Sequence, residues 1–538
     1  MKKYGALFVV SVSMFIFALD TTMMNVAITA ITQDLNTEIQ YVQFAIALYA
    51  LVIAAFILLG AKLATIYGAK RIFIIGVILF AIGMLTASVS QNMVMLTVGW
   101  SVIAGLGAAL IVPTGVILLM ENYEGKARAV AFAVFAAVYV GSAAIGPLIG
   151  GAFTTYLSWR WAFLMVFVLD VIILVSSRLV KGQKGSGRAK VDVVGVLLSA
   201  VGFVSVAFGV ICTTNYGWWE ATKPLVICGV EIAPFGLSIA AVLMITGAIF
   251  LLLFVLWERR QGLKGHEPLL PFSLLKNRPY MAGVGVAAII NLCYGALFFC
   301  IPLFVQSILF LNAMQSGLIL MPLTIALLVA SLVTPRLAAK VPAKYLSIVG
   351  IAIAIIGTVV LANSFSADMA VTAMIPGFVV YGLGMGLGLA QLQNLTLSSV
   401  KASETNEGSG LFNGLRNLGW SIGTAIVGTL LITFLLSGLV AGINGSAVLP
   451  QEDKGELKAV VTQSTKAMER EDLEAEIKNI VGDYPDEYKE ELKTITGDAV
   501  GHSMRVTFYT LAGILGVGLV ASLFLSRRKL VSSADDAT

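Results

Sequence analysis

Fourteen long apolar segments, separated by short charged or Pro- and Gly-rich breaks, constrain this chain more than any other feature. Hydrophobic residues make up 58% of the 538 residues and charged residues only 12%, whereas about a quarter of a soluble domain is charged. A helix needs about 20 apolar residues to cross a bilayer. Soluble enzymes, disulfide scaffolds and disordered regulators are therefore excluded. We predict an all-α membrane protein with fourteen transmembrane helices, near residues 5–31, 42–62, 71–90, 94–120, 128–155, 160–180, 193–213, 236–257, 281–308, 314–339, 345–363, 370–398, 408–440 and 506–526.

The basic residues are sorted between the two sides of this predicted bundle. Segments on the side of the termini hold 24 Lys and Arg residues, and the short loops on the other side hold only Arg160 and Lys223. Because basic residues favour the cytoplasm, we expect a multi-pass protein of the cytoplasmic (plasma) membrane with both termini cytoplasmic. The apolar run after Met1-Lys2-Lys3 is too long for a signal peptide, so it is interpreted as the first helix.

Two outer loops have a composition of their own. Residues 223–235 are interpreted as a hairpin or an interfacial segment. Residues 451–504 contain 14 acidic and 7 basic residues. Apolar residues recur there at helical spacing, which predicts two short amphipathic helices in an acidic extracellular cap; a solvated acidic loop is the alternative. The two sets are Leu473, Ile477 and Ile480, and Tyr488, Leu492 and Ile495.

Short patterns repeat about 280 residues apart, which indicates an internal duplication. Gly105-Leu106-Gly107 is repeated by Gly382-Leu383-Gly384, and Gly141 and Gly146 are repeated by Gly423 and Gly428. The duplication predicts two six-helix bundles related by a pseudo-twofold axis, with two extra central helices between them. Related bundles around a cavity suit alternating access. The predicted regions are 1–180 (N-terminal bundle), 181–280 (helices 7 and 8 with basic loops), 281–440 (five helices of the C-terminal bundle), 441–505 (cap) and 506–538 (last helix and basic tail).

Three motifs resemble those of one transporter family. They are Gly141-x4-Gly146-Pro147-x-x-Gly150-Gly151, Leu19-Asp20-Thr21-Thr22-x-x-Asn25-Val26-Ala27 and Trp159-Arg160-Trp161-x-Phe163. The chain resembles the major facilitator superfamily, in particular its fourteen-helix drug:proton antiporter branch, which includes quaternary-ammonium exporters. The resemblance implies the major facilitator fold, an antiporter motif at Gly141, Gly146, Pro147, Gly150 and Gly151, and efflux of lipophilic, cationic compounds (multidrug efflux) by proton antiport.

Two departures from the family pattern keep other functions open. Thr65 and Ile66 replace an acid and an Arg of the first inner loop, and Ser101 replaces an Arg of helix 4 that is tied to proton coupling in relatives. A lipid, amphiphile or metabolite transporter of the same fold, with altered or absent proton coupling, is therefore the first alternative. A membrane sensor or scaffold acting through the cap is the second.

Ionisable residues inside membrane helices are the strongest functional candidates, because burying a charge in lipid is costly. Asp20 lies beside Thr22 and Asn25, and a carboxyl group there can hold a proton or a cationic substrate, but not readily both. Asp170 lies near the middle of helix 6, where no partner is evident from the sequence. The remaining candidates for the pathway are Asn291, Tyr294, Gln306, Gln391 and Asn394, with interhelical hydrogen bonding as the alternative.

The gating candidates lie close to the predicted inner ends of helices; they are Gly68, Lys70, Arg71, Glu121, Arg128 and Arg416. For Arg416, a side chain that only extends to the interface is the alternative. The chain has two His residues and no Walker loop, so we expect no metal site, no cofactor and no enzymatic activity. The expected partners are a small-molecule substrate, protons and the lipid bilayer, without nucleic acid, and the expected state is a monomer.

Overall fold

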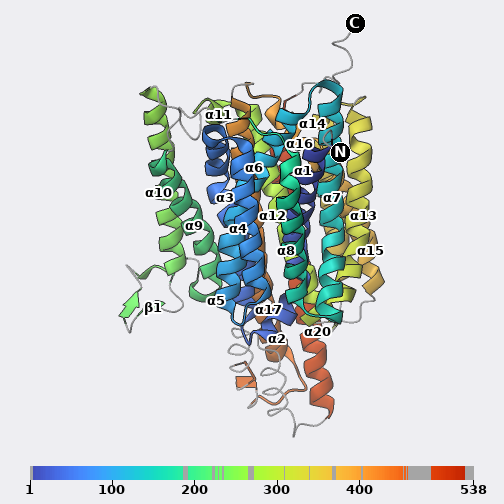
Figure 1. The fold of residues 1–538 in the computed structure, drawn as a ribbon. Coiled ribbons are helices and arrows are strands. Elements are labelled where there is room, and N and C mark those ends of the chain that lie inside the picture. The colour runs from blue at the N-terminus through green and yellow to red at the C-terminus, as the bar shows by residue number, and fades with distance from the viewer. Residues whose placement is uncertain are drawn as a thin grey trace.

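The computed structural model forms one bundle of long, roughly parallel helices (Figure 1). It describes residues 4–526 apart from 184, 186–191, 218, 221–224, 228–229, 233–235, 265–271, 308, 310, 339, 366–370, 402–403, 452–453, 456 and 459–485. Apolar segments become helices in a membrane because only a helix satisfies every backbone hydrogen bond within one segment.

The first six predicted crossings are built from eleven helical elements. They are α1 (Gly5–Met23), the 3-10 turn η1 (Met24–Val26), α2 (Ile28–Asp34), α3 (Ile39–Tyr67), α4 (Ala69–Ser88), α5 (Met93–Leu96), the π-helical η2 (Thr97–Ala104), α6 (Gly105–Asn122), α7 (Gly125–Tyr156) and α8 (Trp159–Ser176), which ends in the short turn η3 (Ser177–Leu179). We call this set the first bundle. Next come α9 (Val193–Tyr216), β1 (Leu225–Ile227), β2 (Val230–Ile232) and α10 (Ile239–Leu263).

The second bundle follows the short α11 (Phe272–Lys276). Its elements are α12 (Arg278–Ser307), α13 (Ala313–Ala338), α14 (Ala343–Ser364), η5 (Val371–Met374), α15 (Ile375–Leu389), α16 (Leu392–Leu397), α17 (Thr405–Gly445) and α20 (Asp486–Ser522). Within the described residues, 13 helical spans are long and apolar enough to cross a membrane. The 32-residue α7, several of whose side chains lie outside the description, completes the predicted fourteen.

The two bundles meet along two pairs of helices. Within the bundles α1 packs on α7 and α12 packs on α17, and between the bundles α7 packs on α13 and α3 packs on α17. This arrangement confirms the predicted pair of related bundles. The extra helices are central in the chain but peripheral in space: α9 lies against α3 and α17, and α10 packs on α9 at the edge of the molecule (Figure 1).

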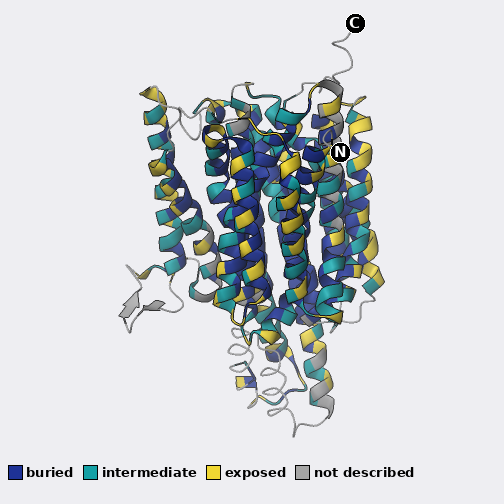
Figure 2. Ribbon diagram, viewed as in Figure 1, coloured by how far each residue is buried: buried dark blue, intermediate teal, exposed yellow. Residues whose placement is uncertain are grey.

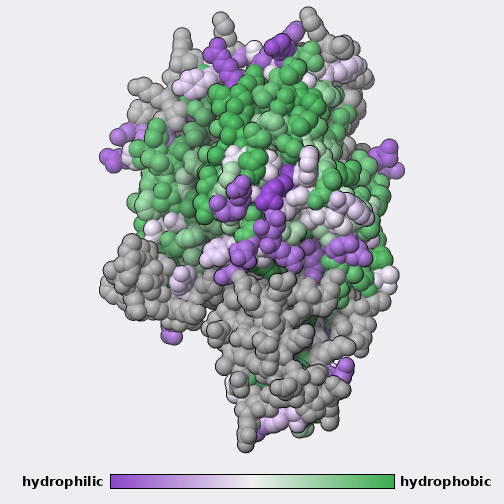
Figure 3. Space-filling model, turned by 60° about the horizontal axis from the view of Figure 1, so that its bottom comes forward, coloured by the Kyte–Doolittle hydropathy of each residue, from purple (hydrophilic) through white to green (hydrophobic). Residues whose placement is uncertain are grey.

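Burial follows the membrane setting. Exposed residues line the outward faces of the helices while the interior is buried (Figure 2). Many large apolar side chains are exposed; on α10 they include Ile245, Ile249 and Leu252. A hydrophobic band covers much of the visible flank, with hydrophilic residues gathered toward the ends (Figure 3).

Helix α1 begins and α20 ends at the same end of the bundle (Figure 1). We call this end the terminal face and the other end the opposite face. On the opposite face β1 and β2 pair antiparallel, with Leu225 opposite Ile232, which confirms the predicted hairpin.

The cap prediction is only partly correct. The residues from Tyr488 to Ile495 do not form a separate short helix, because they continue into the last crossing as the first turns of α20. They pack there against the C-terminal end of α17, where Tyr488 and Ile495 join a small apolar cluster with Leu439 and Ile443. Leu473, Ile477 and Ile480 lie outside the described residues.

Candidate functional site

Asp20 is completely buried inside the first bundle. Its residue is 0% exposed. The indole Nε1 of Trp100 donates hydrogen bonds to both carboxyl oxygens, at 3.0 and 3.1 Å. The Trp100 ring stacks on Tyr49, with 4.9 Å between the ring centroids. The Tyr49 hydroxyl lies close enough to interact electrostatically with the Asp20 carboxyl group, but it donates no hydrogen bond to that group in this conformation. Asp20 is thus surrounded by a neutral hydrogen-bond donor, the Trp100 indole, and by the stacked aromatic rings of Trp100 and Tyr49.

A π-helical segment brings Trp100 to this position. Trp100 and Ser101 lie in the middle of η2, and π-helical insertions are frequent at functional sites. The Ser101 hydroxyl donates to the carbonyl oxygen of Ala45 at 2.7 Å, so it joins η2 to α3 and leaves Asp20 to the indole. Within the described residues, the hydrogen-bond partner of the Asp20 carboxyl is the Trp100 indole and not a Lys or Arg side chain, so an ionised Asp20 would be a buried charge without a compensating cation.

The predicted neighbours of Asp20 serve mainly the backbone. Thr22 donates to the carbonyl oxygens of Ala18 and Leu19, both at 3.2 Å. Asn25 donates to the Thr21 carbonyl at 3.1 Å, and its buried side-chain oxygen has no hydrogen-bond partner.

The antiporter-motif residues lie where α7 touches two helices. A Cβ added to Gly146 would lie 1.9 Å from the Thr22 hydroxyl, and one added to Gly150 would lie 2.6 Å from the Met23 carbonyl oxygen. Gly151 contacts Ala313 of α13, and the Pro147 carbonyl contacts Gly317. Gly141 has open space around its missing side chain. Gly146, Gly150 and Gly151 therefore let α7 pack closely on α1 and α13, and Pro147 lies in the same contact opposite Gly317.

Hydrogen bonds join the bundles toward the opposite face. The Gln306 side chain of α12 donates to the Val26 carbonyl at 2.9 Å, at the 3-10 turn η1, and Gln43 of α3 donates to the Thr424 carbonyl at 2.8 Å. The Met314 amide donates to the Thr155 hydroxyl at 3.0 Å. In this conformation the bundles are closed together near the opposite face.

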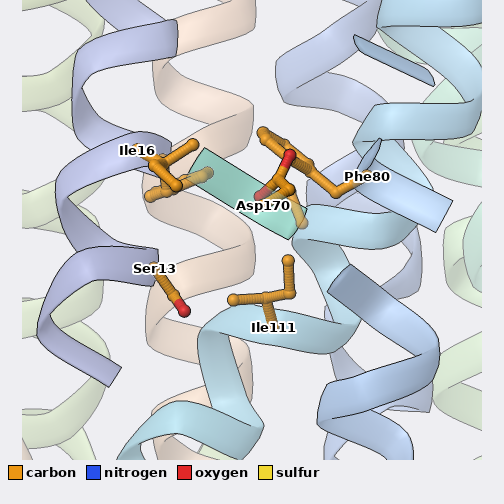
Figure 4. Close-up of a pocket in the computed structure, with 7 residues that line it drawn as sticks. Ser13, Ile16, Phe80, Ile111 and Asp170 are labelled. Carbon is orange, nitrogen blue, oxygen red and sulfur yellow. The ribbon is translucent and has the colours of Figure 1, made fainter. Parts of the chain in front are cut away.

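Asp170 is also buried, at 1% exposure, and it borders a narrow void between α1, α4, α6 and α8 (Figure 4). The void has no room for a water molecule in this conformation. No partner for Asp170 was evident from the sequence, and the structure places it within electrostatic range of Asp20.

The candidates from the second bundle are dispersed. Tyr294 packs on Trp420, with 5.4 Å between ring centroids, and the Asn291 side chain donates to the Ala287 carbonyl at 2.9 Å. Gln391 lies at the break before α16, and Asn394 is exposed. Within the part of the chain that the structure describes, no hydrogen bond or ring contact joins these four residues to Asp20.

Arg416 reaches across to the first bundle and does not extend to the interface. Its Nη2 donates to the Tyr139 hydroxyl of α7 at 3.3 Å, and its guanidinium lies 5.7 Å from the Tyr139 ring centroid. Gly414, two residues earlier, packs against Ala54 and Ile57 in the middle of α3. Arg416 therefore lies near the middle of the membrane span.

Three gating candidates gather around the segment that follows α8. Gly68 has a φ of +93°, which favours glycine, and a Cβ there would lie 2.6 Å from the Gln183 carbonyl oxygen. Lys70 donates to the Val180 carbonyl at 2.7 Å, and Glu121 accepts from the Gln183 amide at 3.2 Å. These residues therefore hold the segment after α8 against α3, α4 and α6 at the terminal face, and within the residues that the structure describes no hydrogen bond joins them to the second bundle there. Arg71 is exposed, and the side chain of Arg128 lies outside the described part of the structure.

Sequence reasoning missed Trp100 and Tyr139. A signal for Trp100 was present, because a buried carboxyl group requires a donor and the departure at Ser101 marked this turn of helix 4. Tyr139 had no such signal, since its role depends on which residue of α17 faces it.

Comparison with known proteins adds independent evidence. Residues 10–424 match the family model of the Major Facilitator Superfamily. A probable actinorhodin transporter of Streptomyces coelicolor is 28% identical over 479 residues, 87% of this chain and 79% of that protein. The multidrug transporter protein MdtP of Bacillus subtilis is 25% identical over 532 residues, 96% of this chain and 92% of that protein.

One solved structure has the same fold. It is a bacterial homologue of the human drug peptide transporters PepT1 and PepT2, with a TM-score of 0.55 and 14% identity, and the match covers 97% of this chain and 98% of that one. At this identity the likeness concerns the fold alone.

Proposed function

Because the chain belongs to the major facilitator superfamily, we propose that it exports lipophilic compounds in exchange for protons, by alternating access of one site to the two sides of the membrane. The family and its transporter relatives make the chain a multi-pass transporter of the plasma membrane rather than an enzyme. Export as the direction is supported by relatives named as a multidrug transporter and as a cephamycin export protein.

The observation that carries the proposal is the environment of Asp20. The Asp20 carboxyl group is fully buried, accepts hydrogen bonds from a neutral indole and has no cationic partner within the described residues. Such a group is suited to carrying a proton through the membrane. It lies on α1, which packs on α7, and α7 in turn contacts the second bundle. Movement between the bundles can therefore change the water access of Asp20, which is the requirement for exchanging its proton.

The terminal face is proposed to be cytoplasmic. The sorting of basic residues supports this orientation. The inter-bundle hydrogen bonds of Gln306 and Gln43 then close the extracellular side. With the extracellular side closed, opening of the terminal side would let the transporter receive substrate from the cytoplasm.

A cationic substrate remains part of the proposal. Asp20 supplies the negative charge for it, and the aromatic rings of Tyr49 and Trp100 would favour a lipophilic cation next to them. Such contact requires Asp20 to become exposed to the central space in another conformation.

The test uses inverted membrane vesicles from a host without its own drug exporters. An imposed pH gradient should drive accumulation of ethidium, a lipophilic cation, and Asp20→Asn should lower that accumulation at least 100-fold. Asp192→Asn is the matched control, because it neutralises a carboxyl group at the N-terminus of α9. Equal accumulation by wild type and Asp20→Asn would remove the proton-carrier role. Neutral chloramphenicol, run in parallel, tests the preference for cations.

One observation favours a second candidate, a lipid or amphiphile transporter without proton coupling. The position of the family's coupling Arg is taken by Ser101, whose hydroxyl is used for packing on α3. In the same vesicles, transport of a fluorescent phosphatidylcholine that is insensitive to the pH gradient, with no ethidium transport, would favour this candidate.

A further inference from the structure

Asp170 is a buried carboxyl group that the proposed function does not use. It lies on α8, a helix at the flank of the first bundle. Its residue is 1% exposed, whereas Val168 and Val171 on either side are 50% and 41% exposed. The side chain is thus turned away from lipid and into the bundle. A carboxyl group on a lipid-flanked helix is costly unless the fold uses it.

The surroundings of Asp170 do not satisfy it. Its Oδ2 is buried and makes no hydrogen bond. The void beside it is lined by Ser13, Ile16 and Phe17 of α1, Phe80 of α4, and Ala108 and Ile111 of α6. Figure 4 shows the carboxyl group between Ile16 on one side and Phe80 on the other. Buried polar groups are almost always hydrogen-bonded, so this unpaired oxygen calls for an explanation.

Asp170 and Asp20 form an electrostatically connected pair. Asp20 acts on Asp170, and both carboxyl groups act on the Tyr49 hydroxyl between α1 and η2. Their heights differ. Asp170 borders Ser13, Ile16 and Phe17, which precede Asp20 on α1 and therefore lie nearer to the terminal face, where α1 begins. Asp170 therefore lies on the terminal side of Asp20.

We propose that Asp170 is a proton relay between Asp20 and the water at the terminal face. The inference rests on the proposed role of Asp20 as proton carrier. When the terminal side opens, the O–H bond of the Asp170 carboxyl breaks and its proton passes to water. The Asp20 carboxyl then gives its proton to the Asp170 carboxylate, which restores the acid at Asp170 and leaves Asp20 ionised.

The charges around the pair favour transfer of one proton at a time. Within the described residues, Asp20 is the charged group that interacts electrostatically with Asp170, and no Lys, Arg or His side chain does so. An ionised carboxyl group disfavours ionisation of its neighbour, so the pair carries at most one negative charge. The Ser13 hydroxyl, which donates to the Val9 carbonyl at 2.8 Å, and the Asp170 carboxyl are the polar groups that would hold water in the void once it widens.

The test compares net proton-driven transport with exchange that moves no proton. The purified full chain is placed in liposomes containing the pH indicator pyranine. Asp170→Asn should lower pH-gradient-driven ethidium transport and the accompanying proton flux at least 10-fold. It should leave ethidium binding and ethidium–ethidium exchange within twofold of wild type. Asp170→Glu, which keeps a transferable proton, should restore at least a third of the driven transport, and Asp192→Asn should have no effect.

Each other outcome decides against the relay or against the function. Driven transport at the wild-type level in Asp170→Asn overturns the relay, as does an equal loss of driven transport and exchange, which indicates a structural role. If Asp170→Asn does not fold, Ser13→Val, which fills the void and keeps the acid, must give the 10-fold slowing; unchanged transport again overturns the relay. Absence of any pH-driven transport in wild type contradicts the proposed function itself.

Discussion

The two bundles share their packing but differ in the charges that they bury. Glycines of α7 contact α1 (Gly146) and α13 of the other bundle (Gly151), and glycines of α17 contact α12 (Gly423) and α3 of the other bundle (Gly428). The pairs of helices correspond but the repeated glycines do not, because Gly141 has open space where Gly423 contacts α12. Yet the first bundle buries two acids inside its helices, Asp20 and Asp170, whereas α12 to α16 of the second bundle contain no Asp or Glu and the acid of α17, Glu407, lies in its first turn.

The second bundle instead places one cation, Arg416, near the middle of the span. Duplication thus preserved the surfaces on which the bundles move and left each half free to specialise. The proposed proton groups lie on one half and the fixed positive charge lies on the other. Because Arg416 touches the first bundle through Tyr139, a change in bundle orientation changes the field that the two acids experience.

The largest expected effect tests the shared packing. Gly150→Val would place side-chain carbon against the backbone of Met23, where a Cβ already lies 2.6 Å from the carbonyl oxygen. Overpacking of this kind costs about 1–3 kcal/mol, so we expect a lowered Tm and loss of most transport. Thermal unfolding of the purified protein and ethidium transport measure the two effects.

Gly141→Val is the matched control for this change, because nothing lies within 4 Å of a Cβ added there. Both variants add the same side chain to the same helix. If they lower Tm equally, the loss comes from helix propensity and not from the contact between α1 and α7, and the packing half of the comparison is wrong.

A second prediction concerns the donor to the buried acid. Trp100→Phe removes the hydrogen bonds that stabilise an ionised Asp20, and a lost bond to a buried group costs about 1–3 kcal/mol. Asp20 should then release its proton only at higher pH. We expect the pH at which ethidium transport is half-maximal to rise by about 1 unit, since one unit corresponds to about 1.4 kcal/mol.

Trp257→Phe makes the same chemical change elsewhere, because the Trp257 indole donates to Asp192 at 2.7 Å. Its pH profile should match that of wild type. A profile for Trp100→Phe that is lower in amplitude but unshifted would mean that Trp100 only packs against Tyr49.

The sequence was sufficient for the helices but not for the contacts of the site. A crossing segment must be apolar over its whole length, so composition reveals it, and the glycine patterns revealed the duplication. The partner of Asp20 depends on the π-helical segment 97–104, which turns Trp100 inward, and no periodicity marks such an insertion. Asp170 was visible as an acid in helix 6, but its inward direction depends on how α8 rotates against α4 and α1.

A third prediction tests the cation of the second bundle. Arg416→Gln removes the charge over Tyr139 and keeps a donor, and a cation–aromatic contact of this kind contributes about 0.5–2 kcal/mol. We expect a two- to tenfold decrease in the rate of ethidium transport, with binding changed less than the rate. Arg336→Gln, at an exposed position of α13, is the control. Identical rates for both variants would show that Arg416 has no role between the bundles.

The smallest expected effect concerns the closed opposite face. Gln306→Ala removes the hydrogen bond from α12 to the Val26 carbonyl, whose net contribution is about 0.5–1.5 kcal/mol. The population open at the opposite face should therefore rise about two- to tenfold. Double electron–electron resonance between spin labels at Leu157, directly after α7, and Gln315, in the first turn of α13, measures that population. Gln393→Ala, on α16, should leave the distances unchanged. If Gln306→Ala leaves them unchanged as well, the contact does not hold the bundles together. The closure then depends on other contacts between the bundles, such as that of Gly151 of α7 with Ala313 of α13.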